Sequence, residues 1–154
     1  MLSPAPFDDA ARRVASVLEP HLCDCELLDT ERLLPDPERY RQYVLHVEPG
    51  GVFTIAALVW LPGQKTPIHD HVSWCTVGVY QGCEFEVQYA CSDASPKSPP
   101  AVLGSTFHKA GEVQALSPGS DIHAVENPGP GIAISLHIYG ADLSELGSSI
   151  RRSY

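Results

Sequence analysis

Short apolar runs that stop at glycine or proline fill the chain from about residue 40 onward, and they limit the folds open to it. Residues 41–47 and 52–61 are rich in β-branched and aromatic residues and are joined by the turn sequence Glu48-Pro49-Gly50-Gly51. Similar strand-like runs follow at 75–80, 83–90, 112–116, 122–126 and 132–139. Short strands at a spacing of roughly 8–12 residues are typical of a β-sandwich or β-barrel. The pattern therefore predicts a mainly β fold.

The segments on either side of these strands differ in pattern. Apolar residues recur every three or four positions over 7–18, with two aspartates in the first turn, which predicts a helix ended by Pro20. We further expect a short helix at 29–34, a surface loop at 92–100 and a short tail at 142–154 for which a helix is one option. The chain has no internal repeat and no long linker, so it is predicted to be one domain. Its parts would be a helical segment at 1–38, a barrel at about 40–140 and a tail at 141–154.

The composition narrows the partners and the compartment. Lys and Arg number 10 against 19 Asp and Glu, and the resulting net charge of −9 disfavours nucleic acid and anionic membranes as partners. No run approaches the ~18 apolar residues of a membrane span, and the first residues lack the apolar segment of a signal peptide. We therefore expect a cytoplasmic protein, in which the cysteines at 23, 25, 75, 83 and 91 stay reduced.

Two histidines separated by one residue give the strongest chemical signal. In an extended strand, His69 and His71 project from the same face while Asp70 points away. Two such imidazoles can bind one metal ion if a third ligand comes from another strand, and His123 is the best candidate for it. The alternative is a pair of ordinary surface histidines. The remaining histidines outside any motif, at 21, 46 and 108, are expected to have no special role.

A second alternating pattern lies near the C-terminal end of the predicted barrel. Over 133–140, the apolar residues Ile134, Leu136 and Ile138 alternate with Ser135, His137 and Tyr139. If the apolar face packs outward against a second layer, the polar face lines the interior of the barrel. Buried polar groups must then bind one another, so a Ser–His–Tyr hydrogen-bonded relay is expected. The alternative is the solvated face of an edge strand.

The spacing around the histidines resembles that of the cupin family. Its first motif matches at Gly63, His69, His71 and Gly82, with Cys75 in the place of the usual acidic ligand. Its second motif matches at Pro118, His123 and Asn127, with Ser120 replacing a glycine. The resemblance implies a jelly-roll-like cupin β-barrel preceded by short N-terminal helices, with the three histidines as metal ligands.

Within the cupins, the missing acidic ligand and the Ser135, His137, Tyr139 run resemble the thiol dioxygenases, that is, cysteine dioxygenase and 3-mercaptopropionate dioxygenase. The likeness extends over about 40–154. It implies one mononuclear Fe(II) per chain and the addition of both atoms of O₂ to a small thiol, which gives a sulfinic acid. The serine, histidine and tyrosine would form the catalytic relay. Three imidazoles also suit Zn, Ni or Cu, so the resemblance alone implies iron.

Recognition of the substrate carboxylate separates the subfamilies. Where cysteine dioxygenases of the mammalian sort carry an arginine, this chain aligns Gln42, with Arg41 as the alternative one residue away and on the opposite face. The glutamine resembles the 3-mercaptopropionate type, which supplies an arginine from the C-terminal segment. Arg151 or Arg152 would then bind the carboxylate. The alternative for both is a solvated basic tail.

Cys75 raises the question of a covalent link. In the mammalian enzymes a cysteine near this position forms a thioether with the tyrosine of the relay, so the resemblance leaves open a Cys75–Tyr139 crosslink. The intervening loop is one residue shorter than in the crosslinked enzymes, which argues against the crosslink.

Two other functions remain open for such a chain. One is a carbon–carbon-cleaving dioxygenase, which also uses three histidines but needs neither the relay nor an arginine. The other is a non-catalytic cupin that binds a metal or senses a small molecule. The choice between cysteine and 3-mercaptopropionate and the oligomeric state stay open.

Overall fold

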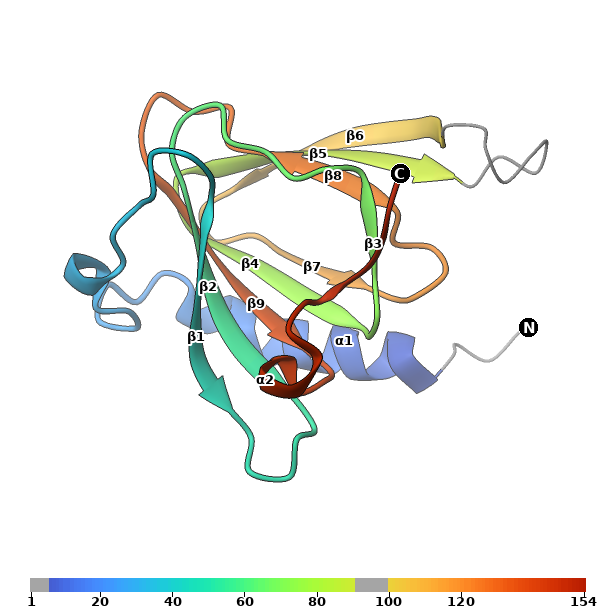
Figure 1. Cartoon of the computed structure of the whole chain (residues 1–154). Coiled ribbons are helices and arrows are strands. Elements are labelled where there is room, and N and C mark those ends of the chain that lie inside the picture. Colours follow the sequence, from blue (N-terminus) through green and yellow to red (C-terminus); the bar gives the residue numbers. More distant parts are fainter. Residues whose placement is uncertain (1–5, 91–99) are drawn as a thin grey trace.

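The chain folds into two antiparallel sheets that face each other, as a computed structural model of residues 6–90 and 100–154 shows (Figure 1). The prediction of a mainly β fold is confirmed. The first sheet contains, in spatial order, β1 (Arg41–Val47), β2 (Thr54–Trp60), β9 (Ala133–Tyr139), β4 (Cys75–Gln81) and β7 (Val113–Leu116). The second contains β10 (Ile150–Ser153), β3 (His69–His71), β8 (His123–Glu126), β5 (Cys83–Ala90) and β6 (Ala101–Lys109).

From β3 onward the chain passes repeatedly from one sheet to the other, and this winding produces the jelly-roll barrel expected of a cupin. Side chains from both sheets point into the space between them. Part of that space is filled by an apolar cluster around Leu58, Trp60, Val77 and Tyr139. The interior is therefore partly a packed core, and the remaining part is available for a site.

The N-terminal segment covers the outer face of the first sheet. Helix α1 (Pro6–Leu18) agrees with the predicted helix and lies across this sheet (Figure 1). A Cβ at Gly78 of β4 would lie 2.8 Å from Leu18 Cδ2, so the absence of a side chain at this position leaves room for the leucines of the N-terminal segment. The helix predicted at 29–34 is only a 3₁₀ turn, Thr30–Arg32, because Leu33 leaves the helical conformation. The buried Leu33 side chain joins the apolar cluster on the outer face of the sheet.

Strand β9 has the two faces that its sequence pattern indicates. Ile134 and Leu136 pack outward in the cluster beneath the N-terminal segment, together with Ala57 and Val59 of β2. The alternate residues of β9 therefore point into the barrel. The polar face is buried, and it does not form a solvated edge, since β9 lies between β2 and β4 in the centre of its sheet.

Two strands lie where the sequence did not predict them. β6 pairs with β5 from Lys109 to Ala101 although most of its side chains are exposed, because an edge strand is held by backbone hydrogen bonds. The C-terminal tail contains a short helix, α2 (Leu143–Leu146), and then β10, which pairs with β3. The tail is therefore part of the second sheet. The loop predicted at 92–100 lies outside the described residues except for its last position.

In the part of the chain that the structure describes, no helix has the length and apolar character needed to cross a membrane.

Candidate metal centre

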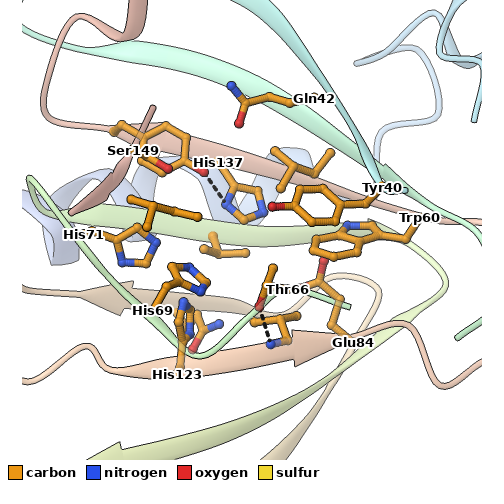
Figure 2. A pocket seen from close by; sticks show the side chains of 16 residues that line it. Tyr40, Gln42, Trp60, Thr66, His69, His71, Glu84, His123, His137 and Ser149 are labelled. Atoms are coloured by element: carbon orange, nitrogen blue, oxygen red, sulfur yellow. Dashed lines mark hydrogen bonds between the residues drawn. The ribbon is translucent and has the colours of Figure 1, made fainter. Parts of the chain in front are cut away.

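Three buried histidines meet at one point inside the barrel. β3 places His69 and His71 on the same face, and β8 places His123 directly opposite His69 in the strand pairing. One ring nitrogen from each histidine lies within 4.8 Å of those of the other two (Figure 2). The structure therefore brings together the three histidines that the sequence singled out.

The ring nitrogen Nδ1 of each histidine has a hydrogen-bond acceptor outside the cluster. His69 donates to the carbonyl of Pro67 at 2.9 Å, His71 donates to Asp121 Oδ2 at 3.0 Å, and His123 donates to Glu86 Oε1 at 2.6 Å. With Nδ1 protonated, each neutral ring keeps the Nε2 lone pair for a metal. Burial, assisted by the neighbouring His123, lowers the pKa of His69 to about 3, which keeps that ring neutral. This donor set fits a divalent transition metal.

Two carboxylates beside the ligands supply negative charge. Burial by itself would raise the pKa of Glu86, but hydrogen bonds from His108 and His123 outweigh it and lower that pKa to about 2. Burial also acts to raise the pKa of Asp121, but hydrogen bonds from the ring and backbone of His71 outweigh it, so that pKa is lowered as well. Both groups are therefore anions that offset the charge of a 2+ ion held by neutral rings. His108, expected to have no role, contacts Glu86 Oε2 at 3.2 Å.

The polar face of β9 forms a hydrogen-bonded relay next to the histidines. Ser135 Oγ lies 2.9 Å from His137 Nε2, and His137 Nδ1 lies 3.1 Å from the Tyr139 hydroxyl. The relay continues at its other end, where the Trp60 indole N–H donates to Ser135 Oγ at 3.2 Å. Burial lowers the pKa of His137 to about 3 and raises the pKa of Tyr139 well above its ordinary value. All members of the relay are therefore neutral.

The histidines and the relay line one small pocket. It encloses about 30 Å³, room for roughly two water molecules, so only a small ligand fits without rearrangement. Gln42 of β1 is among the lining residues, whereas Arg41, the alternative to it, stacks over the Tyr43 ring at 4.8 Å. The other lining residues are Tyr40, Leu58, Trp60, Thr66, Val77, Glu84, Gln114, Val125, Ser149 and Ile150, together with the three histidines, His137 and Tyr139.

The structure does not bring Arg151 or Arg152 into this pocket. Both guanidinium groups bind Asp70, at 2.6 and 2.8 Å from its Oδ2, and the Tyr154 hydroxyl donates to the same oxygen at 3.0 Å. Asp70 points away from the histidines because it alternates with them along β3. An irregularity in the pairing of β10 between Ile150 and Arg152 breaks the alternation, so two consecutive arginines reach one carboxylate. In this arrangement the arginines fasten the C-terminal strand.

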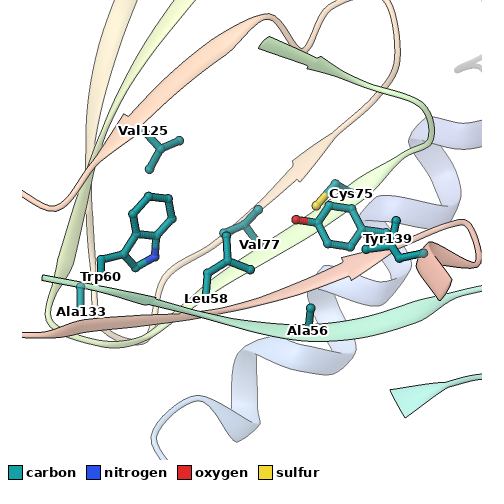
Figure 3. Close-up of a cluster of buried hydrophobic side chains, with 9 residues drawn as sticks. Ala56, Leu58, Trp60, Cys75, Val77, Val125, Ala133 and Tyr139 are labelled. Carbon is teal, nitrogen blue, oxygen red and sulfur yellow. The ribbon is translucent and has the colours of Figure 1, made fainter. Parts of the chain in front are cut away.

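Cys75 is the direct neighbour of Tyr139 across the β4–β9 pairing. Residues directly opposite each other in an antiparallel pair have Cβ atoms about 5 Å apart, and Figure 3 shows the Cys75 sulfur beside the Tyr139 ring. Cys75 is fully buried but is not among the residues that line the pocket. Burial raises the pKa of its thiol well above the ordinary value. The four described cysteines, at 23, 25, 75 and 83, are all free thiols, and Cys91 lies outside the described residues.

A buried glutamate in the pocket was missed by the sequence analysis. On β5, Glu84 and Glu86 alternate with Phe85 and Val87, and such a pattern ordinarily places the acids in solvent. The structure buries both acids and leaves the apolar pair half-exposed. Glu84 is 1% exposed, and neither of its carboxylate oxygens has a hydrogen-bond partner. Burial raises its pKa, although nearby Ser135 and His108 act in the opposite direction.

Solved structures share the barrel. An uncharacterised conserved protein with a double-stranded β-helix domain from Klebsiella pneumoniae superposes with a TM-score of 0.58 at 19% identity, covering 77% of this chain and 87% of that one. A cupin superfamily protein from Desulfitobacterium hafniense gives 0.51 at 14% identity, covering 71% and 84%. Bacillus subtilis oxalate decarboxylase gives 0.54 at 21% identity over 70% of this chain, which spans only 27% of that one. At these identities the likeness shows the cupin fold.

A comparison with protein families identifies the family of the chain as well as its fold. The family model described as cysteine dioxygenase type I matches residues 11–149, from the first turns of α1 to the residue before β10. The match spans the strands that carry the three histidines as well as the strand that carries the relay. The chain therefore belongs to the cysteine dioxygenase type I family.

Proposed function

We propose that this protein is an Fe(II)-dependent thiol dioxygenase that converts a small thiolate and O₂ into a sulfinate, RS⁻ + O₂ → RSO₂⁻. The observation that carries the proposal is the meeting of three metal-competent imidazoles and the Ser135–His137–Tyr139 relay in one small pocket. Membership of the cysteine dioxygenase type I family supports it. A carbon–carbon-cleaving cupin would have no use for the relay.

The metal would be held by His69, His71 and His123, whose Nε2 lone pairs converge. Bound there, Fe(II) would bring thiolate and O₂ together and transfer electrons between them. Asp121 and Glu86 accept hydrogen bonds from Nδ1 of His71 and His123 and so orient these two rings.

The relay prepares a hydrogen-bond donor for the reacting molecules. The indole of Trp60 can only donate, so Ser135 accepts from it and keeps its own proton for His137 Nε2. The neutral His137 then carries its single proton on Nδ1 and donates it to the Tyr139 oxygen. The phenolic proton of Tyr139 is thereby left to donate toward the substrate or O₂. The apolar side chains of Leu58, Val77 and Val125 keep water out of the same space.

The thiol carboxylates expected from the sequence, cysteine and 3-mercaptopropionate, would meet neutral donors in this pocket. Gln42 and Tyr40 line it, whereas none of the lining residues is an arginine or a lysine. A carboxylate would therefore depend on the metal charge and on the amide of Gln42. We place the reaction in the cytoplasm, where small thiols stay reduced.

The test is oxygen consumption by iron-loaded protein with cysteine, cysteamine and 3-mercaptopropionate, with the sulfinate product identified by mass spectrometry. We expect one O₂ consumed per sulfinate formed. The matched control is His21→Ala, which removes a histidine of the N-terminal turn far from the three ligands in the sequence. Protein that carries one iron per chain and consumes no O₂ with any thiol would contradict the proposal and favour a non-catalytic metal-binding cupin.

A further inference from the structure

Glu84 is the one buried side chain, among those that the structure describes, whose polar atoms have no hydrogen-bond partner. A carboxylate removed from water without a partner is costly, and most proteins avoid the arrangement. Glu84 does not orient a metal ligand, because Glu86 accepts the hydrogen bond from His123 and Asp121 accepts the one from His71. The burial of an unpaired carboxyl group at this position is explained if Glu84 binds a ligand that is absent from the free protein.

The position of Glu84 fits a part of the substrate remote from the sulfur. Glu84 lies on the same face of β5 as Glu86 and two residues away, which is about 7 Å along a strand. Glu86 contacts His123, so Glu84 lies one strand repeat from a carboxylate of the metal centre. Figure 2 shows Glu84 lining the pocket beside Trp60 and Tyr40, away from His71.

The surroundings of Glu84 suit a cation. The rings of Tyr40 and Trp60 stack at a centroid distance of 4.5 Å and both line the pocket. Aromatic faces next to a carboxylate form the combination that recognises ammonium groups. The described lining residues include no basic side chain other than histidine, and the two arginines of β10 are bound to Asp70. The pocket therefore has a buried carboxyl group with no basic side chain among its lining residues to pair with it.

We propose that Glu84 binds the ammonium group of the substrate, and that the substrate class is a small aminothiol whose sulfur lies at the three histidines. The proposal rests on the proposed thiol dioxygenase function and names its substrate. A two-carbon aminothiol such as cysteamine carries both required groups and needs no carboxylate site. Cysteine also qualifies through its amine, whereas 3-mercaptopropionate lacks an amine and places a second anion beside Glu84.

The first test compares kcat/KM for cysteamine and 3-mercaptopropionate in iron-loaded wild-type protein and in Glu84→Gln. We expect the wild type to prefer cysteamine by at least about 10-fold. The substitution should lower kcat/KM for cysteamine by about 100-fold, mainly through KM, and leave or raise that for 3-mercaptopropionate. Glu126→Gln is the matched control, since Glu126 lies on β8 and lines a groove on the outer side of the same sheet.

The second test separates this inference from the proposed function. Binding of cysteamine to iron-loaded protein without O₂, measured by calorimetry, should weaken in Glu84→Gln whether or not any thiol is oxidised. A substrate-free Glu84→Leu protein should also have a higher Tm, because an unpaired buried acid is replaced by an apolar side chain that needs no hydrogen-bond partner.

Some results would overturn the role of Glu84 and leave the dioxygenase standing. These are a wild-type preference for 3-mercaptopropionate, an unchanged substrate ratio in Glu84→Gln, or a lower Tm of Glu84→Leu that reveals a structural partner. If Glu84→Gln does not fold, the kcat/KM values of the wild-type protein decide for or against the role of Glu84: a preference for cysteamine supports it and a preference for 3-mercaptopropionate contradicts it. Absence of O₂ uptake with every thiol would instead contradict the dioxygenase, and the anaerobic binding measurement would still decide for or against Glu84.

Discussion

The two ends of the pocket differ in how their buried carboxylates are paired. At the histidine end, Glu86 accepts hydrogen bonds from His123, His108 and Gln88, and its pKa is lowered to about 2. At the other end, Glu84 lies on the same strand and the same face, yet both of its oxygens lack a partner. Both glutamates are almost completely buried.

This difference separates two uses of a buried acid. Glu86 is part of the protein's own structure, because its interactions are complete and they orient a metal ligand. Glu84 is buried without a hydrogen-bond partner, as expected of a group that binds a ligand absent from the free protein. Substitutions at the two ends should therefore have opposite effects on stability and different effects on metal and substrate binding.

Removing a ligand should have the largest effect. His123→Ala leaves two imidazoles, and the metal then lacks the third side of its site. We expect metal content to fall from one ion per chain to a small fraction of that after dialysis, and thiol-dependent O₂ uptake to fall by about 1,000-fold or more. Metal analysis alongside the oxygen electrode checks both. Full activity in the variant would mean that these histidines do not form the centre.

Glu86→Gln tests the histidine end of the pocket, where the buried carboxylate is hydrogen-bonded. Losing the charged acceptor of His123 Nδ1 should weaken metal binding by about 10–100-fold, whereas Glu84→Gln should leave metal affinity within about 3-fold. The ordinary pKa of Glu86 is 4.5 and its folded value is about 2. Its contribution to stability is therefore complete above pH 4.5 and is lost as the pH falls toward 2. Thermal unfolding of metal-free protein across this range should show a weaker pH dependence in Glu86→Gln than in wild type.

The relay should affect the reaction rather than binding. Tyr139→Phe removes the hydroxyl at the end of the relay, and we expect kcat to fall by about 10–100-fold with the metal content unchanged. Ser135→Ala should have a smaller effect, because Ser135 acts only by fixing the proton position on His137. Steady-state kinetics with metal analysis measures both. Equal losses of kcat and metal in Tyr139→Phe would indicate a structural role for the hydroxyl.

Arg151 and Arg152 of β10 lie outside the pocket, so replacing them should affect stability and not substrate binding. Arg151→Met with Arg152→Met leaves buried Asp70 without its guanidinium partners, so the Tm at pH 7 should fall while KM for any thiol changes by less than about 2-fold. The pKa of Asp70 is lowered from 3.8 to about 2, so its pairing stabilises the fold above pH 3.8 and less as the pH falls toward 2. An unchanged Tm with a KM for 3-mercaptopropionate raised at least about 10-fold would support carboxylate binding by these arginines.

Cys75 should give the smallest effect. If a thioether with Tyr139 forms during turnover, with O₂ as the oxidant, each chain loses two hydrogen atoms, and intact-mass measurement after turnover detects the loss. We expect Cys75→Ser to abolish any such loss and to change kcat by less than about 3-fold, because Cys75 does not line the pocket. An unchanged mass in the wild type after turnover would exclude the crosslink.

Much of the site could be predicted from spacing along the chain. His69 and His71 must share a face in any strand, and the alternation of Ile134, Leu136 and Ile138 with polar residues predicts one buried polar face in β9. These patterns depend on the period of two that every strand has. The motif around His123 supplied the third ligand, and the antiparallel pairing of β3 with β8 was needed only to bring it close.

Other features were decided by tertiary contacts. The acidic face of β5 is buried because its partners, the rings of His123 and His108, come from β8 and β6. The two arginines of β10 lie on Asp70 because an irregular pairing lets both reach it, which no local pattern indicates.

The sequence by itself determined the mainly β fold, the shared face of His69 and His71 and the order of the relay, because each follows from local periodicity, and the motif around His123 added the third ligand. Only the tertiary structure decided which face of β5 is inside, and so placed an unpaired carboxylate in the pocket and left the two arginines of β10 outside it. The physical reason is that burial and charge pairing depend on what the other strands bring to a face, and a single strand does not encode its neighbours.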